Sequence, residues 1–211
     1  MPNPIYVGYA TAVHESGHAV ISHVLGRGLI HVALLDDQRG EVVPMCSLCD
    51  ACVEYYQAHS IENHDHTRRI QKNLRCDSAV AVAGEIAERL ICGQTNIDPK
   101  EIARDLELSK SRASLQHLWT ESDCWVLGKW KVDGECSTCV DYLIKLKLVV
   151  RQITDEQEIR SAIEALAHQL SERKRLYEPE VSEFLSEREV ESGSKRNQVL
   201  SRLGVETTPP I

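Results

Sequence analysis

Residues 8–25 read GYATAVHESGHAVISHVL and carry the clearest helical pattern in the chain. Their apolar side chains recur at helical spacing: Tyr9, Ala12, Val13, Val20, Ile21, Val24 and Leu25. This spacing places them on one side of an α-helix, and Gly26 and Gly28 can end that helix in a left-handed conformation. The segment therefore predicts an amphipathic helix over residues 8–25.

Inside this predicted helix lies His14-Glu15-Ser16-Gly17-His18, an HExxH motif. Residues four apart lie on one face of a helix, so both imidazoles can converge on one metal ion. The carboxylate of Glu15 then lies beside the metal, where it can take a proton from water that the metal has acidified. The motif predicts a catalytic zinc ion held by His14 and His18, with Glu15 as the general base.

A catalytic zinc ion needs three protein ligands and one open position, so a third ligand must come from elsewhere in the chain. The candidates are carboxylates in later segments: Glu85, Glu88, Asp98 and Asp105. Spacing alone does not choose among them.

The residues that follow the first helix predict a small hairpin. Residues 30–35 are an apolar run, the polar residues 36–40 form a turn, and residues 42–45 are a second apolar run. Proline cannot donate a hydrogen bond to a sheet ladder, so Pro44 predicts that the second strand is short or lies at an edge.

Apolar periodicity and end signals predict further helices at residues 67–92, 99–118, 155–175 and 179–185. In the helix predicted at residues 67–92 the apolar pattern weakens near Asp77, so the helix could be interrupted there. Residues 119–139, which hold all three tryptophans, predict an irregular segment or a short hairpin.

Together these elements predict an α+β fold that is mainly α-helical, with the HExxH helix beside a small β-sheet and a C-terminal helical part. Residues 1–150 would form a metallopeptidase core that includes the HExxH helix and the helix of the third ligand. Residues 151–190 would form a C-terminal helical segment of the same domain, and residues 191–211 a loosely ordered tail.

Charge and hydropathy exclude several classes of function. The net charge is -8, and an acidic chain is repelled by a phosphate backbone, so we expect no nucleic-acid partner. No stretch supplies the roughly 18 apolar residues that span a bilayer, and the first 26 residues lack the Lys or Arg of a signal peptide. We therefore expect a soluble, cytoplasmic protein without a membrane segment.

The eight cysteines include two CxxC pairs, Cys46 with Cys49 and Cys136 with Cys139. Four thiolates from two such pairs can hold a structural zinc ion, so a second zinc site is one interpretation. The 86 residues between the two pairs exceed the roughly 15–20 of a zinc ribbon. A redox-sensitive dithiol, a disulfide, a thiolate that blocks the catalytic zinc and plain core cysteines stay open as alternatives.

Three segments of the sequence share an order with those of one known family. They are HESGHAV at residues 14–20, the strand pair at 32–35 and 40–45, and VAGEIAERLICG at residues 82–93. Each is similar to a segment of the FtsH-type peptidase domain, the M41 family of zinc metalloproteases. The first resembles the family's HEAGHA segment and the last its glycine-rich helix. The resemblance covers roughly residues 10–115, with a weaker echo at residues 155–188.

The resemblance implies roles for three acidic residues. In that family the third zinc ligand is an aspartate that opens an Asp-Leu pair, which Asp105 and Leu106 match. The family's preceding Thr-Thr-Gly-Ala is replaced here by residues 99–102, which leaves Asp98 as a rival. Glu88 aligns with a family glutamate and would orient a zinc ligand through a hydrogen bond, without binding the ion itself. The alternative is that Glu88 is an ordinary carboxylate on the helix surface.

The resemblance also implies hydrolysis of peptide bonds in peptides or unfolded proteins. FtsH proteases carry an AAA ATPase module, but no Walker A pattern occurs in this sequence. We therefore expect a peptidase that acts without ATP or borrows an unfoldase, and the family's hexamers make a homo-oligomer a further expectation. The alternatives are a catalytically inactive zinc-binding regulatory protein that keeps the peptidase fold, and a zinc-stabilised interaction module.

Overall fold

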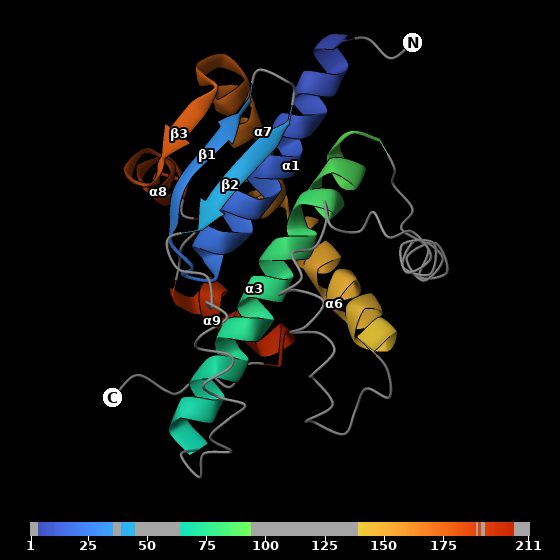
Figure 1. Ribbon diagram of the computed structural model, residues 1–211, viewed down its shortest axis with the longest axis vertical. Coiled ribbons are helices and arrows are strands. Elements are labelled where there is room, and N and C mark those ends of the chain that lie inside the picture. Colours follow the sequence, from blue (N-terminus) through green and yellow to red (C-terminus); the bar gives the residue numbers. More distant parts are fainter. Residues whose placement is uncertain are drawn as a thin grey trace.

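The computed structural model describes residues 4–35, 39–44, 64–93, 139–188, 190 and 193–204, and every structural statement concerns these. Within them the chain is α+β and mainly α-helical, as predicted, with six helices and one three-stranded sheet (Figure 1). The elements, labelled as in Figure 1, are α1 (Pro4–Val24), β1 (Leu29–Leu34), β2 (Gly40–Pro44), α3 (His64–Ile91), α6 (Cys139–Thr154), α7 (Gln157–Arg173), β3 (Arg175–Tyr177), α8 (Glu178–Ser186) and α9 (Gly193–Arg202).

Helix α1 is the central element and packs against α3, α7 and the sheet (Figure 1). Six of the seven residues of its predicted apolar face are at most 1% exposed: Ala12, Val13, Val20, Ile21, Val24 and Leu25. Gly17 lets α3 approach closely, because a Cβ there would lie 2.6 Å from Cβ of Ala87 and 2.9 Å from the carbonyl oxygen of Ala83. Gly26 follows the helix with a φ of +65°, which is the predicted left-handed end.

The sheet has the strand order β2-β1-β3 with antiparallel pairs, so the predicted hairpin is confirmed and gains a third strand. Val32 of the central strand and its partner Leu176 are buried in the core. β2 lies at an edge of this sheet, as Pro44 predicts. The sequence does not predict β3, because three residues directly after a helix are too few to show a period of two.

Helix α3 runs without interruption through Asp77. The carboxylate of Asp77 accepts hydrogen bonds from Nε and Nη2 of Arg27, at 2.8 and 3.1 Å. The weak apolar pattern at this position therefore marks an ion pair with the segment after α1, and the interruption that the sequence left open does not occur.

Helix α6 packs against α3 and was not predicted. Its residues Leu146, Val150 and Ile153 are at most 4% exposed and are spaced by four and three positions, so they form one buried stripe. The helix runs across residue 150, where the peptidase core was expected to end.

The stripe predicted for α7 is confirmed, since Ile159, Ile163, Leu166 and Leu170 are fully buried. Pro179 lies in the first turn of α8, as predicted, and Glu180 accepts a hydrogen bond from the backbone N–H of Tyr177 at 2.8 Å. This contact caps the start of α8.

The expectation of a loosely ordered tail from residue 191 is wrong for residues 193–202, which form α9. Val199 and Leu200 of this helix are at most 2% exposed, so the core holds it in place. The predicted helix at residues 99–118 lies outside the described residues, as do residues 119–138 of the irregular segment predicted at 119–139; Cys139 begins α6. None of the described helices combines the length and apolar character that a membrane crossing requires.

Candidate metal and catalytic site

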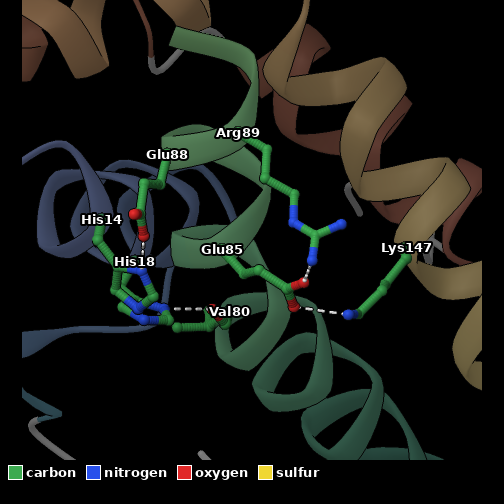
Figure 2. Close-up of polar contacts among 7 residues, drawn as sticks. All are labelled: His14, His18, Val80, Glu85, Glu88, Arg89 and Lys147. Carbon is green, nitrogen blue, oxygen red and sulfur yellow. Dashed lines mark hydrogen bonds and ion pairs between the residues drawn. The ribbon is translucent and has the colours of Figure 1, made fainter. Parts of the chain in front are cut away.

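His14 and His18 lie one turn apart on α1 and face α3 (Figure 2). Nδ1 of His14 lies 3.0 Å from Oε2 of Glu88, and Nδ1 of His18 lies 2.6 Å from the carbonyl oxygen of Val80. A carbonyl and a carboxylate only accept hydrogen bonds, so Nδ1 is the donor in both rings. In the neutral imidazoles Nε2 then keeps its lone pair, which is the form that binds a metal ion.

The two Nε2 atoms converge on the backbone of Gly84 in α3. A Cβ at this position would lie 2.7 Å from Nε2 of His14 and closer still to Nε2 of His18. The ring centroids are 4.9 Å apart, and the ring planes meet at 71°. The space that the missing side chain leaves therefore borders both free nitrogens, which fits two imidazoles sharing one ion.

Two of the four candidate third ligands have other partners. The carboxylate of Glu88 accepts the hydrogen bond from His14, which is where the predicted orienting role requires it. Glu85 points away from the histidines (Figure 2) and pairs with Nζ of Lys147 at 2.5 Å and with Nη2 of Arg89 at 2.9 Å. Both contacts disfavour a direct metal bond from these two glutamates.

The other two candidates, Asp98 and Asp105, lie outside the described residues. In the part of the chain that the structure describes, no group of three or more His, Cys, Asp or Glu side chains is placed to hold a metal ion. The geometry thus brings together two of the predicted ligands, His14 and His18, and the third stays a prediction.

Three of the four cysteines of the predicted second site, Cys46, Cys49 and Cys136, lie outside the described residues. Cys139 is the first residue of α6, but its side chain is not described. A second zinc ion therefore stays a prediction.

Glu15 reaches from α1 to the first residue of β2. Its side chain lies against Gly40, where a Cβ would come within 2.5 Å of Oε1. Glu15 is 8% exposed, and burial raises the pKa of its carboxyl to about 7. The charge of His14 opposes this rise, while the charges of Glu41 and Glu88 add to it. A group with such a pKa can accept and return a proton near neutral pH.

The two histidines have opposite pKa shifts. Burial lowers the pKa of His18 to about 4, the charge of His14 adds to the effect, and the hydrogen bond to Val80 opposes it. Burial also lowers the pKa of His14, but the hydrogen bond to Glu88 and the charges of nearby glutamates outweigh it and raise this pKa. A metal ion would compete with the proton on His14, so its affinity should fall in acid.

No protein-family model matches the chain. A search of the curated proteins likewise finds no match.

Sequence reasoning identified the histidines and both glutamates but missed Val80, Gly84 and Gly40. A backbone carbonyl such as that of Val80 has no sequence signal, because every residue carries one. Gly84 had one, since a glycine inside a predicted helix costs stability and often marks a close approach. Gly40 had none, because the sequence places it in the predicted turn at residues 36–40, where a glycine is common.

Proposed function

We propose that this protein is a zinc-dependent peptidase that resembles the FtsH-type domain, with His14 and His18 holding the ion. One observation carries the proposal: both Nδ1 atoms have acceptors, and both Nε2 atoms face the space beside Gly84. Acceptors of this kind fix the orientation and tautomer of zinc-binding histidines. Asp105 is the proposed third ligand on the resemblance alone, with Asp98 as its rival.

Zinc in such a site supplies a Lewis acid that acidifies water and polarises a peptide carbonyl. Glu15 acts as the general base that takes the proton from the attacking water and passes it to the leaving amine. Its burial and its pKa of about 7 suit a group that must change protonation twice in one turnover. Glu88 keeps the ring of His14 oriented throughout.

The outer edge of β2 suits an extended substrate. The N–H of Leu35 donates to the carbonyl of Arg39 at 2.7 Å, and hydrogen-bonded pairs alternate along the hairpin from there. By this alternation the backbone groups of Gly40 and Val42 point away from β1. A peptide in extended conformation can pair with them as an added strand.

The position of Glu15 beside Gly40 brings this edge to the proposed base. Peptides, flexible segments and unfolded chains can adopt the extended conformation that strand addition needs, whereas a folded domain cannot. Such substrates need no prior unfolding, so we propose hydrolysis without ATP, or with an unfoldase supplied by another protein.

Metal analysis combined with a labelled-peptide assay tests this function. The wild type should bind zinc and cleave the peptide, and Glu15→Gln should keep the zinc and lose turnover by about 100-fold or more, because it removes only the base. Glu183→Gln is the matched control, since this exposed glutamate of α8 lies outside the site. It should keep full activity.

Each alternative outcome identifies a different reading. Equal cleavage by wild type and Glu15→Gln would mean that a contaminant does the hydrolysis. Bound zinc without cleavage by either protein would support the inactive regulatory protein. A double variant with Cys136→Ser and Cys139→Ser keeps both site histidines. If it nevertheless unfolds, the result would support the zinc-stabilised interaction module.

A further inference from the structure

Gly40 is the first residue of β2, pairs with Leu34 of β1 and lies directly against Glu15. A Cβ at position 40 would collide with the Glu15 side chain at Cγ, and it would lie 2.5 Å from both Cδ and Oε1. Real Cβ atoms essentially never approach other atoms this closely. The carboxylate of Glu15 therefore occupies space that any other residue at position 40 would fill.

The backbone at position 40 does not require glycine. Gly26, Gly93 and Gly204 are the described glycines with positive φ, a conformation that favours glycine. Gly40 is not among them, so its backbone conformation is open to other residues. Glycine in a strand otherwise weakens it, which leaves the close approach of Glu15 as the physical reason for glycine here.

Glu15 depends on packing for its position. It is buried, and no described residue donates a hydrogen bond to its carboxylate, whereas His14 and His18 are each oriented by a hydrogen bond. The surface on which the Glu15 side chain lies is the backbone of β2 at Gly40. A change in that surface must move the carboxylate.

We propose that Gly40 is a positioning residue for the general base: its missing side chain lets Glu15 lie against the edge strand. The inference rests on the proposed peptidase function, and it adds that one residue serves two purposes. The backbone groups of Gly40 point to the outer edge of β2, where a substrate strand can pair. The same residue holds the base at that edge.

A double-mutant cycle on thermal stability tests the contact without any assay of activity. In chelator-treated protein, Gly40→Ala should lower Tm by several degrees, because the added methyl collides with Glu15. In a Glu15→Ala background the collision is gone, so the same substitution should leave Tm unchanged or raise it. Gly8→Ala is the matched control: its Cβ would meet nothing within 4 Å, and its effect should be equal in both backgrounds.

Steady-state kinetics test the catalytic part. In zinc-loaded protein, Gly40→Ala should lower kcat at least tenfold, while zinc affinity and KM stay within about twofold of wild type, because neither metal ligand is touched. A general loss of structure would instead change zinc affinity and kcat together. Gly8→Ala should leave all three values unchanged.

The inference is overturned if Gly40→Ala lowers Tm equally in both backgrounds, or if an active wild type keeps its kcat after the substitution. A wild type that binds zinc without cleaving peptides would refute the proposed function instead. The thermal cycle would still decide whether Gly40 makes room for Glu15, so the two failures can be told apart.

Discussion

Gly84 of α3 faces the rings of His14 and His18, and its lack of a side chain leaves them room. In Gly84→Ala the added Cβ would collide with Nε2 of His14 and of His18, so at least one ring must turn away from the shared space. We expect zinc affinity to fall by about 10–100-fold, measured by competition with a chromophoric chelator. The helix itself should persist, because alanine favours a helix more than glycine does.

Gly8→Ala makes the same chemical change on α1 where the added methyl meets nothing within 4 Å. This variant should bind zinc like the wild type. If Gly84→Ala also bound zinc with unchanged affinity, the ion would have to lie elsewhere than between the two rings.

The sequence predicts the candidate metal ligands and the candidate base of this site better than the residues that hold them in place. His14, Glu15 and His18 are recognisable because helix periodicity and a short motif coincide on one segment. Val80 contributes only its carbonyl oxygen, and Gly40 contributes only the absence of a side chain. Neither contribution can be seen before the helices and strands are placed in space.

A partly buried ion pair joins α3 to α6. Nζ of Lys147 donates to Glu85 at 2.5 Å, and the Lys147 side chain is only 6% exposed (Figure 2). Removing one partner leaves the other charge buried, which costs more than removing the pair. We expect Glu85→Ala to lower the free energy of unfolding by about 1–3 kcal/mol. This is less than for a fully buried pair, because Glu85 is 34% exposed and solvent screens its charge.

Lys147→Met, which keeps the apolar stem and removes the charge, should cost about 1 kcal/mol or less. Adding it to Glu85→Ala should restore part of the lost stability, because the ammonium group no longer lacks a partner. Urea denaturation of the two single variants and the double variant measures all three effects. Additive losses in the double variant would show that the two side chains are not coupled.

Helix α9 is tied to the start of α7 by Glu156, which pairs with Lys195 at 2.8 Å and with Arg202 at 2.5 Å. Burial raises the pKa of Glu156, but the hydrogen bonds and charges of both cations outweigh this and lower it. A carboxyl with a depressed folded pKa stabilises the fold above its ordinary value of 4.5 and loses this contribution as the pH falls further. We therefore expect α9 to loosen below about pH 4.5.

Amide hydrogen exchange at Val199 and Leu200, the buried residues of α9, reports this loosening. Exchange should accelerate relative to α7 as the pH falls from neutral to below 4.5, after correction for the intrinsic pH dependence. In Glu156→Gln the charge is already absent, so α9 should be looser at neutral pH and respond less to acid. An acid response of the same size in this variant would assign the effect to other carboxyl groups.

The two helices that the sequence missed, α6 and α9, lack a clear helical pattern for different reasons. In α6, Ile144-Lys145-Leu146-Lys147-Leu148 alternates with a period of two, which is typical of a strand and hides the helical stripe. In α9, the helix is short and mostly polar, and contacts with other elements hold it in place. The long stripe of α7 was predictable because its own spacing suffices.

Viewed as a whole, the molecule gathers the candidate site from elements that lie far apart in the sequence. α1 carries the two histidines and Glu15, α3 supplies Val80, Gly84 and Glu88, and β2 supplies the surface under Glu15. Both histidines lie on α1, but unfolding separates them from Glu88 and Val80 of α3, which orient their rings. An ion that binds both rings in the folded arrangement must therefore stabilise the whole fold.

Zinc at about 100 times its Kd should stabilise the fold by about 2.7 kcal/mol. For a chain of 211 residues this corresponds to a rise in Tm of about 5–10 °C, measured by scanning calorimetry and reversed by a chelator. Gly84→Ala keeps every proposed zinc ligand but should lose the rise in Tm, whereas Gly8→Ala should keep it. A zinc-induced rise that survives in Gly84→Ala and vanishes in Cys136→Ser would place the stabilising ion among the cysteines instead of between the imidazoles.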